Sequence, residues 1–179
     1  MQPKRKSIML ITHKGGCPNL KDGKNQLMLD RDLPADDFEL VVKVASHFEV
    51  SGSFLAVNLV KDESNYFLIE LYSENYLGEH RHSIYFTKHF EGQDAGHFQS
   101  VVGAARDAYL RITREGSQYS GSYALIDPAK PVGADQLQWV NLGTMPWIRL
   151  QPKLLLCAAN YQDAPEVSAE FFSVTLRPK

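Results

Sequence analysis

The strongest constraint on the fold is an alternation of apolar and other residues with a period of two, which recurs through most of the 179 residues. Successive side chains of an extended strand point to opposite faces, so this alternation predicts strands with one buried face. Turn residues interrupt the alternation at short intervals, as in a β-sandwich or barrel. Clear strands are expected over residues 38–46, 54–60, 66–73, 83–87, 108–114, 118–124, 138–142, 153–160 and 168–176, and weaker ones over 8–12 and 26–30.

Three short polar segments that contain glycine or asparagine separate neighbouring strands. Residues 50–53, 61–65 and 114–117 each predict a hairpin, because Gly and Asn tolerate the positive φ of tight turns. About a dozen strands in one domain imply two stacked sheets. The predicted fold class is therefore an all-β, two-sheet antiparallel jelly-roll sandwich, with residues 8–179 as one domain after a flexible tail over 1–7.

Two stretches do not fit a central strand. Pro128 and Pro131 exclude residues 127–136, because proline has no N–H for the ladder, and they predict an exposed loop. Residues 92–108 leave room for a helix but contain two glycines that weaken one. We interpret this second stretch as a loop with a short strand.

The charge balance and hydropathy exclude two classes of partner. Nineteen Lys and Arg against 21 Asp and Glu leave a net charge of -2, which provides no broad basic surface for nucleic acid. No apolar run approaches the roughly 18 residues that would span a bilayer, and no signal peptide is visible. We expect no nucleic acid and no membrane partner, and a cytoplasmic location for the chain as given. A domain excised from a secreted protein would look the same.

Cysteine and histidine provide weak signals. Cys17 lies in a glycine-rich turn and Cys157 in an apolar run, and we expect two free thiols. His80 and His82 would share one face of a strand and could bind zinc with a third ligand such as Glu79, His89 or His97. Exposed turn histidines are the preferred interpretation, so no metal and no cofactor are expected.

The alternation also assigns residues to faces. Leu55, Val57 and Leu59 should point between the sheets, as should Phe67, Ile69 and Leu71, and Leu110 and Ile112. The other faces combine aromatic rings, on which a sugar can stack, with polar groups that bind hydroxyls. The candidate ligand-binding residues there are Asn58, Glu70, Tyr72, Tyr85, Arg111, Tyr123 and Trp139. The alternative is an exposed face that serves only packing and solubility.

Two of these residues raise questions of chemistry. Glu70 and Arg111 could form an ion pair across adjacent strands, which is a structural role. As a catalytic acid, Glu70 would need a second carboxylate about 5 to 9 Å away, and no motif supplies one.

The order of several segments resembles concanavalin A-like domains of the DUF1349 type and the C-terminal domain of family 43 β-xylosidases. The segments are QLMLDR (26–31), DFELVVKV (37–44), GSFLAV (52–57), DESNYFLIE (62–70), YLRITREG (109–116), WVNLG (139–143) and AEFFSV (169–174). The resemblance covers most of residues 8–177. It implies two antiparallel sheets, one bent into a groove, and an association with carbohydrate. In that family the last strand often reads Phe-Asp-x-Phe, with the aspartate near a cation in some relatives, whereas Phe172 stands here.

Three functions follow as hypotheses. The first is a carbohydrate-associated, non-catalytic binding or accessory module that uses the concave face and works beside an oligosaccharide, a protein partner or a catalytic domain. The second is an intracellular protein-interaction or regulatory β-sandwich without catalytic activity. The third is a glycan hydrolase, which would require two acids facing each other across the groove.

Overall fold

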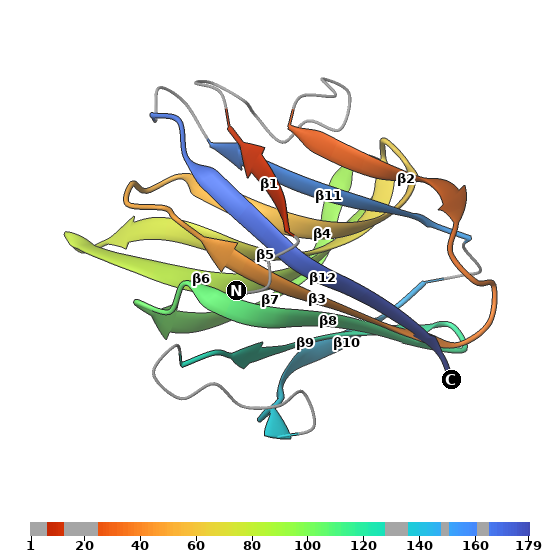
Figure 1. Cartoon of the computed structure of the whole chain (residues 1–179). Helices are drawn as coiled ribbons and strands as arrows, with labels where there is room; N and C mark the ends of the chain where they lie inside the picture. Colours follow the sequence, from red (N-terminus) through yellow and green to blue (C-terminus); the bar gives the residue numbers. More distant parts are fainter. Residues whose placement is uncertain (1–6, 13–24, 128–135, 148–150, 161–164) are drawn as a thin grey trace, which may run out of the picture.

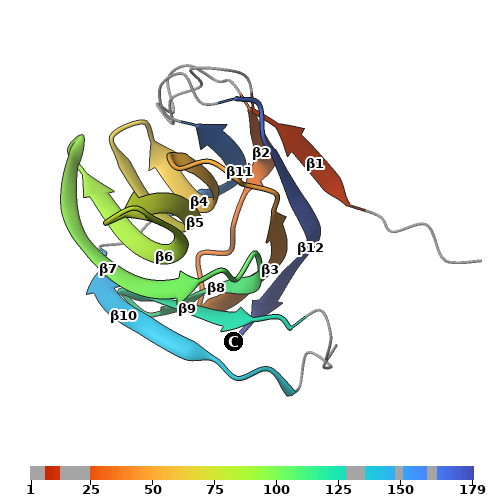
Figure 2. The same ribbon diagram turned by 90° about the vertical axis from the view of Figure 1, so that its left-hand side faces the viewer.

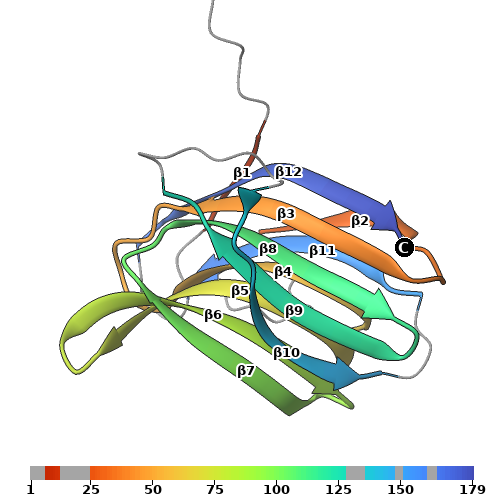
Figure 3. The same cartoon turned by 90° about the horizontal axis from the view of Figure 1, so that it is seen from below.

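The computed structural model describes residues 7–12, 25–127, 136–147, 151–160 and 165–179, and these form two six-stranded antiparallel sheets. Sheet A has the order β1(Ile8–Ile11), β12(Ser168–Pro178), β3(Phe38–Ser46), β8(Asp107–Glu115), β9(Gln118–Leu125) and β10(Val140–Pro146). Sheet B has the order β2(Gln26–Asp32), β11(Lys153–Asn160), β4(Ser53–Asp62), β5(Asn65–Tyr76), β6(Glu79–Phe90) and β7(Gln93–Gly103). Figure 1 and Figure 3 show the sheets as stacked layers, which confirms the predicted jelly-roll sandwich.

The core lies between the two sheets, where the alternation placed it. Leu55, Val57 and Leu59 of β4 are buried in it, as are the inward residues predicted for β5 and β8. Its aromatic centre is Phe67, whose ring centroid lies 5.4 Å from that of Phe86 and 4.7 Å from that of Trp147. Burial of each such side chain contributes about 1.5 to 3 kcal/mol, so the inward side chains of the central strands stabilise the stacking of the layers.

The strand β7 corrects the prediction of a loop over residues 92–108. It runs for 11 residues at the edge of sheet B and pairs only with β6 among the described strands. Its side chains alternate between exposed and half-buried, and none is fully buried. The sequence of this strand therefore shows only a weak alternation of apolar residues. Gly96, with φ of +138°, lies where the register shifts between Thr87 and His89. The sequence predicts that Gly96 weakens regular structure in this segment, whereas it lies at a bulge in an edge strand.

Two of the three predicted hairpins are confirmed, and one is wrong. Residues 61–65 join β4 to β5, and residues 114–117 join β8 to β9, within one sheet each. Residues 50–53 instead connect β3 in sheet A to β4 in sheet B. The turn itself forms as expected, with Gly52 at φ of +87° and its N–H donating to Ser73 O at 2.7 Å. Local turn chemistry therefore does not determine which sheet the next strand joins.

The outer faces of the two sheets point to opposite sides of the molecule, as Figure 2 shows. No helix of the described residues is long and apolar enough to cross a membrane. Cys17, most of the tail over 1–7 and most of the expected loop over 127–136 lie outside the described residues.

Candidate functional site

The seven predicted ligand-binding residues lie in three separate places. Asn58, Glu70, Tyr72 and Tyr85 come from β4, β5 and β6 and share the outer face of sheet B. Arg111 and Trp139 lie together on the outer face of sheet A, and Tyr123 lies between the sheets. The prediction of one common face is therefore wrong, although four of the residues do come together.

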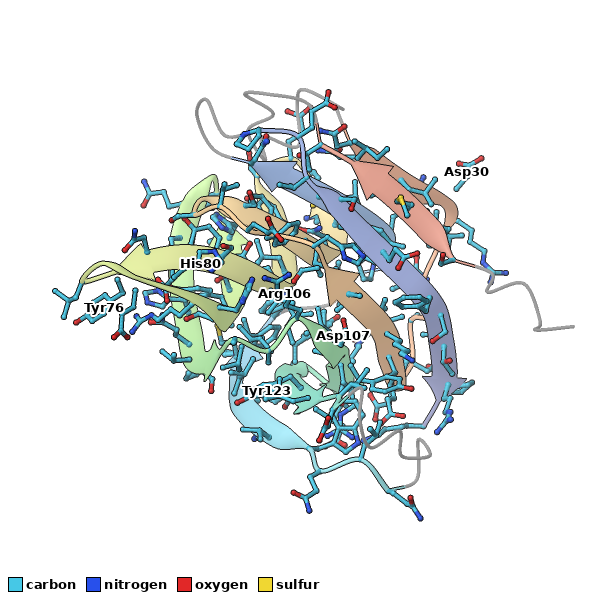
Figure 4. The ribbon with its side chains drawn as sticks, turned by 60° about the vertical axis from the view of Figure 1, so that its left-hand side comes forward. Asp30, Tyr76, His80, Arg106, Asp107 and Tyr123 are labelled. Carbon is cyan, nitrogen blue, oxygen red and sulfur yellow. The ribbon has the colours of Figure 1, made fainter. Side chains whose placement is uncertain are left out.

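Tyr123 belongs to the core. It pairs with the inward-facing Leu110 across β8 and β9, and only 6% of its surface is exposed. Its hydroxyl forms a hydrogen bond with Ser100 Oγ at 2.7 Å, which satisfies the polar end of the ring. Figure 4 labels Tyr123 on β9, apart from Tyr76 and His80 of the β5–β6 hairpin.

Arg111 is paired within sheet A and not with Glu70. Its guanidinium lies 4.0 Å above the centre of the Trp139 ring, and Nη1 lies 3.5 Å from Oε2 of Glu39. Arg177 Nη1 contacts the same carboxylate at 3.8 Å. The predicted ion pair between Glu70 and Arg111 is wrong, because β5 and β8 belong to different sheets and both side chains point outward. The whole sandwich separates them.

The outer face of sheet B holds a pocket of about 320 Å³, lined by residues from β4, β5, β6, β7 and β11. Glu70 lies near its middle, since the register places it between Ala56 of β4 and Tyr85 of β6. The next row on one side contains Asn58, Leu68, Thr87 and His97. The row beyond contains Val60, Tyr66, His89 and Asp94.

Glu70 is a carboxylate without a partner. It is only partly exposed, and no hydrogen bond or ion pair joins it to the other described residues. Burial raises its pKa to about 8 from an ordinary value of 4.5, and burial is the only cause of the shift. Loss of solvation disfavours the ionised form, and a shifted carboxylate in a pocket is a candidate for function.

The residues at the floor of the pocket form hydrogen bonds within the protein. Asn58 is 2% exposed, and its Nδ2 donates to Leu155 O at 3.2 Å and to Cys157 Sγ at 3.3 Å. Burial raises the pKa of the Cys157 thiol to about 12. These groups hold β11 against β4, and the amide hydrogens of Asn58 are therefore turned away from Glu70.

Aromatic rings form the walls. The rings of Tyr66 and His89 are stacked, with centroids 4.4 Å apart and planes 16° apart. Tyr85 packs edge-on against Tyr72 with centroids at 6.0 Å, and its hydroxyl accepts a hydrogen bond from Gln99 Nε2 at 2.7 Å. Desolvation raises the pKa of both Tyr66 and Tyr85 to about 12, so both hydroxyls remain protonated at neutral pH.

Charged side chains around the pocket contact one another in two pairs. Asp94 Oδ2 lies 3.5 Å from His97 Nδ1, and Arg81 Nε donates to Glu74 Oε1 at 2.9 Å. Among the described residues that line the pocket there is no lysine and no arginine. The pocket thus combines aromatic rings with two carboxyl groups, of which Asp94 contacts His97 and Glu70 has no partner among the described residues.

The two histidines considered for zinc do share a face, which is the inner face of sheet B. Their ring centroids lie 5.3 Å apart, His80 Nε2 lies 2.7 Å from Ser73 Oγ, and His82 is 1% exposed. The preferred interpretation as exposed turn residues is wrong for His82. The described residues contain no group of three His, Cys, Asp or Glu that could hold a metal. His89 and His97 line the pocket on the other face of the sheet.

The predicted ligand-binding set left out several residues that line the pocket, and four of them carry polar or aromatic groups on which the site depends, namely Tyr66, His89, Asp94 and His97. Tyr66 lies on the outward face that the alternation assigned to β5, so its position could have been inferred. The other three depend on β7 and on the full length of β6, which the pattern did not predict. A complete register of the β5–β6–β7 meander is the signal that brings them together.

No family model and no curated protein matches the sequence. Solved structures do match in fold. The chain is similar to part of the Bacteroides ovatus protein titled xyloglucan PUL GH43B, with a TM-score of 0.71 and 14% identity, covering 99% of this chain and 34% of that one. It therefore spans about a third of the length of that protein.

Two further matches cover most of both chains. A functionally unknown protein from Saccharomyces cerevisiae has a TM-score of 0.68 and 16% identity, with 100% of this chain and 91% of that one covered. A legume lectin-like domain from Entamoeba histolytica has a TM-score of 0.62 and 14% identity, covering 86% and 78%. At these identities the likeness establishes the fold type, which agrees with the resemblance to family 43 C-terminal domains and concanavalin A-like proteins. It provides no support for the narrower DUF1349 assignment.

Proposed function

We propose that this domain is a carbohydrate-associated, non-catalytic binding or accessory module whose ligand lies in the pocket on the outer face of sheet B. One observation carries the proposal. The pocket places aromatic rings and an unpartnered carboxylate, Glu70, around a single space of about 320 Å³. Proteins of this fold include a lectin-like domain and a chain titled with xyloglucan and GH43, which supports the ligand class.

The chemistry of the walls suits a sugar ring. A pyranose presents flat C–H patches that pack on aromatic faces, and the stacked pair of Tyr66 and His89 offers such a surface. Hydroxyl groups around the sugar need fixed donors and acceptors. The protonated hydroxyls of Tyr66 and Tyr85 and the carboxyl of Glu70 supply them inside the same pocket.

The proposal is for binding and not hydrolysis. A glycosidase of the usual kind needs two carboxyl groups about 5 to 9.5 Å apart, and the ionised one would raise the pKa of the other. The pKa of Glu70 is raised by burial alone, and the second acid of the pocket, Asp94, lies two rows of side chains away and contacts His97 at 3.5 Å. Glu74, on the same strand, is already bonded to Arg81 and to Ser83 Oγ at 2.5 Å.

The test is a glycan array probed with the purified domain and with single variants. Tyr66→Ala and Tyr85→Ala should each weaken binding at least tenfold, because loss of a stacking platform costs more than about 1.4 kcal/mol. Trp139→Ala is the matched control, since this aromatic residue lies on the outer face of sheet A. Binding that Trp139→Ala removes and Tyr85→Ala spares would refute the assignment to sheet B. Absence of binding to any glycan would refute the function.

A further inference from the structure

Among the described residues, the pocket on the outer face of sheet B leaves one of its two acids, Glu70, without a partner. Two carboxylates, Glu70 and Asp94, line it, and the described lining residues include no lysine or arginine. Asp94 has His97 beside it at 3.5 Å, whereas Glu70 forms no ion pair with any residue that the structure describes. Burial keeps the Glu70 carboxyl protonated at neutral pH in the unbound domain, and a cationic group placed beside it would favour the ionised form and pair with it.

Glu70 also lacks hydrogen-bond donors. The side chain of Asn58 also lines the pocket, but its Nδ2 donates to Leu155 O and to Cys157 Sγ. Tyr85, opposite Glu70 on β6, accepts a hydrogen bond from Gln99 of β7, and no hydrogen bond between its hydroxyl and Glu70 is present among the described residues. Once it is ionised beside a cation, this carboxylate accepts several hydrogen bonds, so the ligand must supply most of the donors. An ammonium group has three donors and no acceptor.

The walls favour the same kind of group. The faces of aromatic rings attract cations, and desolvated pairs of this type contribute about 2 kcal/mol. Tyr66, Tyr85 and Phe54 lie around the pocket that contains Glu70. Aromatic rings next to a carboxylate are the combination that binds organic cations, while a neutral hydroxyl would use only the carboxylate.

We propose that the pocket selects a sugar that carries a protonated amine, with the ammonium group seated against Glu70 beside the rings of Tyr66 and Tyr85. The inference rests on the proposed function, since it names the class of glycan that the same site takes. Stacking on the pyranose ring provides part of the affinity, and the ammonium provides the selectivity. Ligands with an acetylated amine lose the charge and should lose the preference.

The experiment compares three β-1,4-linked oligomers of equal length, built from glucosamine, N-acetylglucosamine and glucose, by calorimetry at pH 6, where Glu70 must release its proton to pair with the ammonium group. The glucosamine oligomer should bind at least tenfold more tightly than either neutral oligomer. Glu70→Gln should abolish this preference and reduce the affinity for the glucosamine oligomer to that for the neutral oligomers. Glu79→Gln, an exposed acid at the start of β6, is the matched control for general attraction between the protein and a polycation, and should keep the preference.

The possible outcomes distinguish failure of the amine selectivity from failure of the carbohydrate-binding function. Equal binding of all three oligomers, with loss on Tyr85→Ala, would overturn the amine selectivity and leave the carbohydrate function standing. A preference that survives Glu70→Gln would overturn the role of Glu70. Cadaverine, a diamine without a sugar ring, is the last probe: affinity equal to that of the glucosamine oligomer would support the cation site and overturn the carbohydrate function. No binding of any probe would overturn both.

Discussion

Burial of the Glu70 carboxyl should make the stability of the domain depend on pH, and Glu70→Gln should remove that dependence. The pKa of this group is about 8 in the folded protein against an ordinary value of 4.5. A difference of about 3.5 pKa units corresponds to about 5 kcal/mol between the two protonation states. Because the carboxyl keeps some contact with solvent, this is an upper value.

The sign follows from proton uptake. The folded state binds the proton more tightly than the unfolded state, so the contribution of Glu70 to stability is fully present below pH 4.5 and is lost as the pH rises to about 8. Glutamine is neutral at every pH and nearly isosteric with the protonated acid. We expect Glu70→Gln to match the wild type at pH 4 and to exceed it by about 3 kcal/mol at pH 7.

The assay is urea unfolding of the wild type and the variant at several values between pH 4 and pH 9, with the difference in unfolding free energy plotted against pH. The difference cancels other titrating groups, such as the buried His82, because both proteins contain them. Glu79→Gln, at an exposed position, should give a flat difference close to zero. A flat difference for Glu70→Gln as well would refute the argument that the folded protein holds this carboxyl in its neutral form.

Three further predictions concern packing and reactivity. Gly121→Ala should lower the unfolding free energy by about 1 to 3 kcal/mol in urea, because the added Cβ would lie 2.3 Å from Phe86 Cγ; an unchanged midpoint would contradict the close approach of β9 to β6. Asn58→Ala should cost about 1 to 3 kcal/mol in the same assay, because Leu155 O loses a buried donor, and full retention of stability would show that this bond is not formed. Cys157 should resist thiol reagents in the native protein and react only after unfolding, as followed by site-resolved mass spectrometry, because burial raises its pKa to about 12. Rapid native labelling at this position would contradict its burial.

The strands and their faces could be predicted because they depend on neighbours in the sequence. Alternation identified β3 and β11 to the residue, and it assigned the inward side chains of β4, β5 and β8 correctly. The same rule failed for β7, since an edge strand with two half-exposed faces has little apolar signal. It also failed for the turn over 50–53, because the sheet that a strand joins is set by distant partners.

The site depended on tertiary structure. The sequence by itself determined that Glu70 and Tyr72 point away from the core, because residues two apart on a strand share a face. It could not determine that Arg111 lies on the opposite side of the sandwich, since an outward residue in either sheet has the same local pattern. Only the pairing of β5 with β6, and of β6 with β7, brings His89 and Asp94 to the pocket that holds Glu70. Strand pairing joins backbone groups that are distant in the sequence. The register of that pairing determines which side chains line the same pocket and which of them are buried away from water.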